Sequence, residues 1–71
     1  MKIRAEVNSD VDGGIRVSET HLSVMADDML YSSTRRVLSE PDSKGHEVEC
    51  LQALRWQLSR IIDDVRNHKQ A

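Results

Sequence analysis

Two hydrophobic periods divide the chain. Near its start, every second residue is apolar over 2–7, and the same alternation recurs over 14–18. A period of two is typical of a β-strand that buries one face. The residues between these stretches are rich in Asn, Asp and Gly, which favour a tight turn. The sequence therefore predicts a short N-terminal β-hairpin.

The C-terminal part of the chain has a helical period. Its apolar residues follow one another at intervals of three and four positions, which is typical of an amphipathic helix with a narrow apolar seam: Val48, Leu51, Leu54, Leu58, Ile61 and Val65. Asp42 or Ser43 can cap this helix, and acidic residues in its first turn suit the helix dipole. We therefore predict a helix over 44–68.

We also predict a helix over 19–40. Ser18 is a suitable N-cap for it, and Pro41 would end it because proline cannot continue a helix. On a helical projection, the apolar residues of this stretch form one stripe: Leu22, Met25, Ala26, Met29 and Val37. Two helices of similar length that are joined by a short link should form an antiparallel hairpin.

The predicted fold is a single α+β domain, mainly α, that spans residues 1–71. It consists of a β-hairpin over 1–18 that packs on a helical hairpin over 19–71. A chain of 71 residues buries little apolar surface, and such domains usually gain support from disulfides, a metal or a second subunit. The single cysteine, Cys50, excludes an internal disulfide and a cysteine zinc cluster. We therefore expect a homo-oligomer, either a dimer or a larger assembly.

Each predicted helix has a second, smaller apolar face. Val24, Tyr31 and Leu38 lie opposite the main stripe of the first helix, and Trp56 lies opposite the seam of the second. Leaving large apolar side chains in water forfeits about 2–3 kcal/mol each. We therefore expect these four residues to form an oligomer or partner interface. The main hypothesis is a non-enzymatic, self-associating module that occludes or scaffolds a partner protein.

A cluster of hydroxyl and guanidinium groups leads to a second hypothesis. Arginine donates forked hydrogen bonds to phosphate and tyrosine stacks on bases, so four residues of this cluster could bind a phosphate: Tyr31, Thr34, Arg35 and Arg36. A compact helical hairpin with such a cluster is similar in outline to phage-encoded sponges that sequester cyclic-nucleotide signals. The cluster would then grip a nucleotide between subunits. The alternative is a solvated helix face on which Arg36 pairs with Glu40.

The segment 8–19 resembles the calcium-binding loop of the EF-hand family. Oxygen-bearing side chains alternate along it, a glycine occupies the sharp turn and a carboxylate closes it: Asn8, Asp10, Asp12, Gly13 and Glu19. The resemblance implies a cation site in which the four side chains other than the glycine are ligands. Hairpin turns use the same residue types, so an ordinary turn is the alternative. We favour the turn and expect no metal or other cofactor.

The charge pattern argues against several classes of partner. Ten basic and twelve acidic residues are interspersed along the chain and give a net charge of −2, so no basic face suited to nucleic acid is present. No apolar run approaches the roughly 20 residues that span a bilayer, and the first residues lack the pattern of a signal peptide. The sequence contains no catalytic constellation. We therefore expect a cytoplasmic protein that is not an enzyme and has no nucleic-acid or membrane partner.

Overall fold

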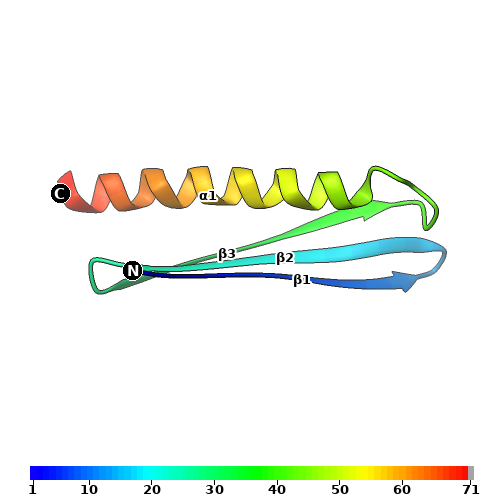
Figure 1. Cartoon of the computed structure of the whole chain (residues 1–71), viewed down its shortest axis with the longest axis horizontal. Helices are drawn as coiled ribbons and strands as arrows, with labels where there is room; N and C mark the ends of the chain where they lie inside the picture. The colour runs from blue at the N-terminus through cyan, green and yellow to red at the C-terminus, as the bar shows by residue number, and fades with distance from the viewer. Residues whose placement is uncertain (71) are drawn as a thin grey trace.

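The computed structural model describes residues 1–70, and the side chains of residues 1–68. Three strands are followed by one helix: β1 (Lys2–Asp12), β2 (Ile15–Ala26), β3 (Met29–Ser39) and α1 (His46–Gln70). The strands form an antiparallel sheet in the order β1-β2-β3, and α1 lies along one face of it (Figure 1). Because all four elements run along one axis, the molecule is elongated, with extents of 46 × 16 × 15 Å.

The predicted helical hairpin is wrong. Residues 19–40 form most of β2, a turn and β3 instead of a helix. The predicted strands over 2–7 and 14–18 and the predicted helix over 44–68 overlap β1, β2 and α1, but all of these elements have different bounds. The fold is therefore a three-stranded meander with one covering helix, and not a helical hairpin with an N-terminal β-hairpin.

Residues 19–40 form strands because a period of two also runs through them. Alternate residues of β2 are buried or half-buried against the helix: Ser18, Thr20, Leu22, Val24 and Ala26. The apolar stripe that suggested a helix arises because spacings of three and four can coincide with a strand pattern over a short stretch. Threonine and valine, which are branched at Cβ, favour strands, and serine and threonine compete with helical backbone hydrogen bonds.

Two tight turns define the meander. Gly13 and Gly14 connect β1 to β2 with φ angles of 59° and 81°, which are typical of a two-residue hairpin turn. Asp27 and Asp28 connect β2 to β3 with φ angles of 52° and 63°. Aspartate tolerates this left-handed region better than most residues, although glycine is the usual choice. The second turn was missed because an Asp-Asp pair is a weaker turn signal than Asn-Gly or Gly-Gly.

The interface between α1 and the sheet alternates between apolar and polar layers. Two apolar clusters are buried there: Leu22, Val24 and Ile61 in one, and Val37, Cys50 and Ala53 in the other. Between them along α1 lies Gln57, which is fully buried. Thr20 Oγ1 donates to Gln57 Oε1 at 2.7 Å, and Gln57 Nε2 donates to the Thr20 carbonyl oxygen at 2.9 Å. Buried polar groups are costly when unpaired, so this reciprocal pair opposes sliding of the helix.

His46 forms a second polar layer at the start of α1. Its exposed fraction is 1%, and its ring nitrogens contact the hydroxyl oxygens of Ser18 at 2.6 Å and Ser39 at 2.5 Å. The Ser18 hydroxyl also contacts that of Ser9 at 2.6 Å. These hydrogen bonds connect the first turn of the helix to all three strands.

The helix leaves β1 uncovered. Every residue of β1 is exposed, whereas alternate residues along much of β2 are buried. A groove between β1 and α1 is lined by large exposed side chains of Ile3 from β1 and of Leu58 and Ile62 from α1. On β1, the exposed side chains of Val7 and Val11 continue the same face of the strand as Ile3. We call this surface the β1 groove. One helix is about 10–12 Å wide and strands are about 4.8 Å apart, so one helix covers roughly two strands.

The turn after β2 provides a test of the backbone geometry. Asp28→Gly should raise the free energy of unfolding by about 0.5–1 kcal/mol, because glycine adopts the left-handed region without steric cost. Gly14→Ala should lower it by about 1 kcal/mol, because its φ of 81° disfavours any side chain. Urea denaturation measures both changes, and a destabilised Asp28→Gly variant would contradict the assigned turn.

The Thr20–Gln57 pair can be tested by a double-mutant cycle. Thr20→Val retains the shape of the side chain but leaves Gln57 Oε1 buried without its donor, which should cost about 1–3 kcal/mol. Gln57→Leu should cost less, because the single Thr20 hydroxyl proton then has the Arg35 carbonyl oxygen, 3.1 Å away, as its acceptor. Combining both changes should cost less than the sum of the single losses. Strictly additive losses in urea denaturation would show that the two side chains are not coupled.

Candidate functional site

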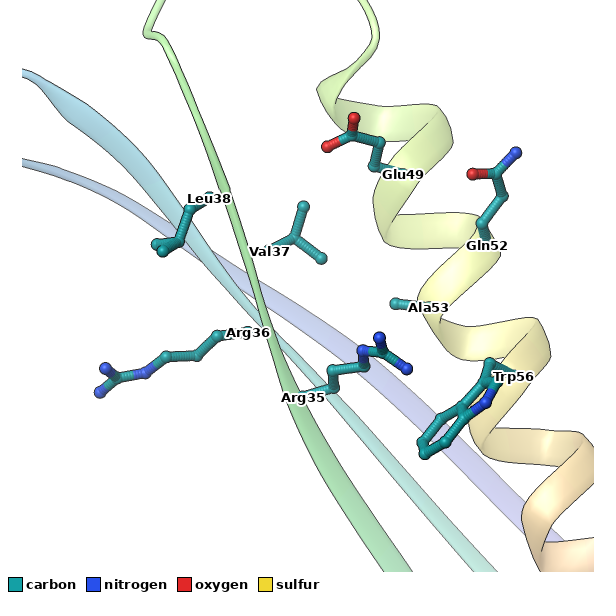
Figure 2. Close-up of a pocket in the computed structure, with 8 residues that line it drawn as sticks. All are labelled: Arg35, Arg36, Val37, Leu38, Glu49, Gln52, Ala53 and Trp56. Carbon is teal, nitrogen blue, oxygen red and sulfur yellow. The ribbon is translucent and has the colours of Figure 1, made fainter.

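An open groove runs between β3 and one flank of α1 (Figure 2). Its volume is about 390 Å³, and eight residues line it: Arg35, Arg36, Val37 and Leu38 from β3, and Glu49, Gln52, Ala53 and Trp56 from α1. We call it the β3–α1 groove. β3 is an edge strand, so its outer backbone N–H and C=O groups have no partner strand in the described part of the chain. The groove therefore lies beside main-chain groups that can accept another strand.

Trp56 lies at one end of this groove, beside Arg35 (Figure 2). Its side chain is 48% exposed, and the Cζ atoms of Arg35 and Arg60 lie 4.4 Å and 5.4 Å from its ring centroid. Cations are attracted to the electron-rich faces of aromatic rings, so the two guanidinium groups help to hold the indole in place. Within the described residues, neither arginine forms an ion pair with a carboxylate. Both guanidinium groups therefore retain hydrogen-bond donors for a ligand.

The side chains of β3 divide between two faces of the sheet. Figure 2 shows Arg35 and Val37 directed toward α1, and Arg36 and Leu38 directed away from it. This alternation is the normal pleat of a strand. A ligand that lies along the β3 edge would therefore meet arginine and apolar side chains on both of its own faces.

The predicted phosphate-binding residues do not converge. Because they alternate along β3, Tyr31 and Arg35 lie on the helix side of the sheet, and Thr34 and Arg36 lie on the other side. The Thr34 hydroxyl contacts Nδ1 of His21 at 3.1 Å on that other side. Arg35 meets Trp56 instead, a contact that the sequence alone did not indicate, because it depends on α1 lying over β3.

The four residues predicted as an interface do not share one surface. Val24 is 4% exposed and belongs to the core, and Tyr31 is half-buried against the same cluster. Leu38 is 60% exposed on the sheet face away from α1, and Trp56 lies in the β3–α1 groove. Of the four, Leu38 and Trp56 are the most available to a partner. The sequence predicts that the N-terminal strands pack against the helices, so the exposed residues of the β1 groove are not among the predicted interface residues.

The segment that resembles a calcium-binding loop is mostly extended strand. Asn8, Asp10 and Asp12 lie along β1, and Glu19 lies across from Asn8 on β2. The glycine at the expected sharp turn, Gly13, belongs to the two-residue hairpin turn. Over the described residues, no group of three or more His, Cys, Asp or Glu side chains is arranged to hold a metal ion.

The buried histidine and cysteine are placed for packing. His46 contacts two serine hydroxyls, an arrangement that can serve in catalysis when a substrate reaches it. Here the imidazole and the Ser18 hydroxyl lie under α1, and both residues are almost completely inaccessible. Cys50 is also buried, as a free thiol. These groups therefore stabilise the helix–sheet interface.

No protein-family model matches the chain, and neither a curated protein nor a solved structure shows significant similarity to it. Among the described residues, no helix combines the length and the apolar character needed to cross a bilayer. The features of the described residues that bear on function are the two grooves and the two open strand edges.

The hydroxyl group of Tyr31 provides a test of the core beside the β3–α1 groove. It is buried without a hydrogen-bond partner within the described chain. Because an unpaired buried hydroxyl is costly, Tyr31→Phe should leave the free energy of unfolding unchanged or raise it by up to about 1 kcal/mol. Tyr31→Ala should lower it by about 3 kcal/mol or more, because the ring packs on the core. A clear loss of stability in Tyr31→Phe would show that the hydroxyl has a partner.

Proposed function

We propose that this protein is a non-enzymatic, self-associating binding module that takes up an extended segment of a partner protein in the β3–α1 groove. The observation that carries this proposal is the half-exposed Trp56, which two guanidinium groups flank beside an unpaired strand edge. Tryptophan and arginine are enriched among the residues that dominate protein interfaces. A strand added to a sheet edge gains affinity from main-chain hydrogen bonds and specificity from its alternate side chains.

The chemistry of the groove favours a particular kind of segment. A strand added along β3 directs its alternate side chains to the two faces of the sheet. On one face they would meet Arg35 and Trp56, and on the other Arg36 and Leu38. Guanidinium groups bind carboxylates by charge-assisted hydrogen bonds. We therefore propose that the segment carries both acidic and apolar side chains.

Binding of this kind requires no chemical step. The partner segment would be occluded along the edge that pairs with β3, and the flank of α1 that carries Trp56 would lie beside one of its faces. The free, buried thiol of Cys50 suits a reducing compartment, and we propose a cytoplasmic location on this ground.

The only tryptophan of the chain reports directly on the groove. We expect a blocked peptide of alternating valine and glutamate, about eight residues long, to change the indole fluorescence saturably when it pairs with β3. A peptide of alternating valine and lysine should give no saturable change, because its ammonium groups share one face of the strand and would meet either Arg35 or Arg36 there. Equal affinity for the two peptides would contradict the proposed charge selection.

Matched variants identify the surface that responds. Arg35→Ala should weaken binding of the glutamate peptide about tenfold or more, because it removes a cation beside the indole. Arg55→Ala removes an exposed arginine of α1 that does not line the groove. It should leave the affinity for the glutamate peptide unchanged. Unchanged binding to both Arg35→Ala and Arg36→Ala would exclude the groove as the site, because the glutamates share one face of the peptide strand and meet one of these two arginines. A saturable response to a cyclic nucleotide without one to the glutamate peptide would support the nucleotide-sponge alternative instead.

A further inference from the structure

β1 carries charged side chains at both of its ends that form no ion pair with the other described residues. On the sheet face away from α1, six polar residues follow one another along β1: Lys2, Arg4, Glu6, Asn8, Asp10 and Asp12. The four at the ends of this series lie across from uncharged residues of β2, namely Met25, Ser23, Val17 and Ile15. None of these four forms an ion pair within the described chain. β1 is therefore positive at its beginning and negative at its end.

This charge distribution is complementary to itself when two copies of β1 run antiparallel. A two-fold axis through Val7 places every charge at the strand ends opposite a charge of the other sign: Lys2 across from Asp12, and Arg4 across from Asp10. Opposite charges directly across an antiparallel pair stabilise it. Each of these contacts occurs twice in the dimer because the interface is symmetric.

The same register also matches the apolar face of β1. Ile3 lies opposite Val11 and Val7 lies opposite its own copy, all on the side of the sheet that carries α1. Directly opposed side chains share a face of the sheet, so both helices lie on one side of the paired strands. The two β1 grooves then meet and form one apolar surface between the helices.

Other pairings of β1 with itself are less favourable. A shift of two residues in one direction places Glu6 opposite Glu6, and a shift in the other direction places Glu6 opposite Asp10. A shift of one residue opposes charged and apolar side chains, because it exchanges the two faces of one strand. A parallel pair in register would place Lys2 beside Lys2 and Arg4 beside Arg4. The charges therefore select one antiparallel register.

The other open edge lacks this property. β3 contains two adjacent arginines, Arg35 and Arg36, and no acidic residue. Self-pairing of β3 therefore forms no ion pair in any register. Only the β1 edge is complementary to a second copy of the chain.

We propose that a second copy of this chain docks along β1 in the register centred on Val7, and that the resulting two-fold dimer has one continuous antiparallel sheet of six strands. The inference specifies the self-association included in the proposed function, and it does not involve the β3–α1 groove. Pairing along an eleven-residue strand would form about ten main-chain hydrogen bonds. These bonds would pair the main-chain N–H and C=O groups on the outer edge of β1, so that this edge would no longer be exposed.

Charge reversal tests the register. By sedimentation equilibrium at about 0.1 mM, the unmodified protein should have twice the chain mass of 8.1 kDa. Arg4→Asp and Asp10→Arg each replace two ion pairs per dimer by two like-charge contacts. Each should therefore raise the dimer dissociation constant about tenfold or more. A monomeric unmodified protein, or a mass that keeps increasing beyond the dimer, would overturn the proposal.

Mixing the two single variants provides the decisive measurement. In the proposed register, an Arg4→Asp chain and an Asp10→Arg chain form only opposite-charge contacts with each other. An equimolar mixture should therefore recover the dimer as a heterodimer, which native mass spectrometry identifies by its mass. The double variant, which exchanges both charges, should dimerise with itself. Circular dichroism of each single variant first excludes a general folding defect. If neither the mixture nor the double variant then forms a dimer, the proposed register is wrong.

Matched controls carry the same charge changes elsewhere on the surface. Arg55→Asp and Asp63→Arg alter exposed residues of α1 and should leave the dimer intact. A comparable loss of dimer in these controls would overturn the assignment to β1. The Arg4→Asp monomer should still respond to the glutamate peptide, so a failure of the dimer can be distinguished from a failure of the groove.

A second pair of variants tests the register if the substitution of Asp10 prevents folding. Its Oδ1 accepts a hydrogen bond from the Val11 backbone N–H at 2.8 Å, which arginine would remove. If Asp10→Arg does not fold, Lys2→Asp and Asp12→Lys test the outer ion pair by the same mixing experiment. Lack of recovery in that mixture would count equally against the register.

Discussion

One helix cannot cover a sheet of three strands, and this limit determines which surfaces the protein presents. The width of a helix corresponds to roughly two strand spacings. Since α1 lies over β2 and β3, the whole of β1 and one flank of the helix face outward. Small domains are stable by only about 5–15 kcal/mol, and each large aliphatic side chain left in water forgoes about 1.5–3 kcal/mol. Burial of these surfaces against a second copy would therefore matter more here than in a larger protein.

The polar layers between the helix and the sheet determine the position of α1 along the sheet. A purely apolar face would let an amphipathic helix take several positions of similar energy, whereas a buried amide must meet its specific partner. Gln57 meets Thr20, and Thr20 lies across from Arg35 in the β2–β3 register. Because Trp56 precedes Gln57, this pairing also brings the indole to the Arg35 guanidinium. The geometry of the candidate site thus follows from a buried hydrogen-bond pair next to it.

The sequence predicts the two ends of this fold better than its middle. The seam of α1 and the alternation over 2–7 each fit one period well. Over 19–40 the residues fit two periods, and the choice between them depends on a turn at Asp27 and Asp28 whose signal is weak. Strand pairing also depends on contacts between distant segments, which local propensity does not encode.

The errors at the candidate site follow from that choice of period. On a helical projection Val24 points away from the main stripe, so it was assigned to an interface, whereas in β2 it points into the core. Arg35 and Arg36 were grouped because they are adjacent, but adjacent residues of a strand face opposite ways. The contact between Arg35 and Trp56 could be found only after α1 had been placed over β3. The order of charges along β1, in contrast, can be read from the sequence. It indicates self-pairing only when β1 is known to be an edge strand.

The two edges of the sheet differ in a way that would limit growth of the assembly. A sheet whose edges both accept another copy can extend without end, which is the usual hazard of exposed edge strands. β1 is complementary to itself about a two-fold axis, so one pairing event uses that edge completely. β3 gains no ion pair from its own copy, because Arg35 and Arg36 meet only positive or neutral residues there. The proposed dimer would therefore close at β1 and leave its two outer edges, with their tryptophans, for acidic segments of another protein.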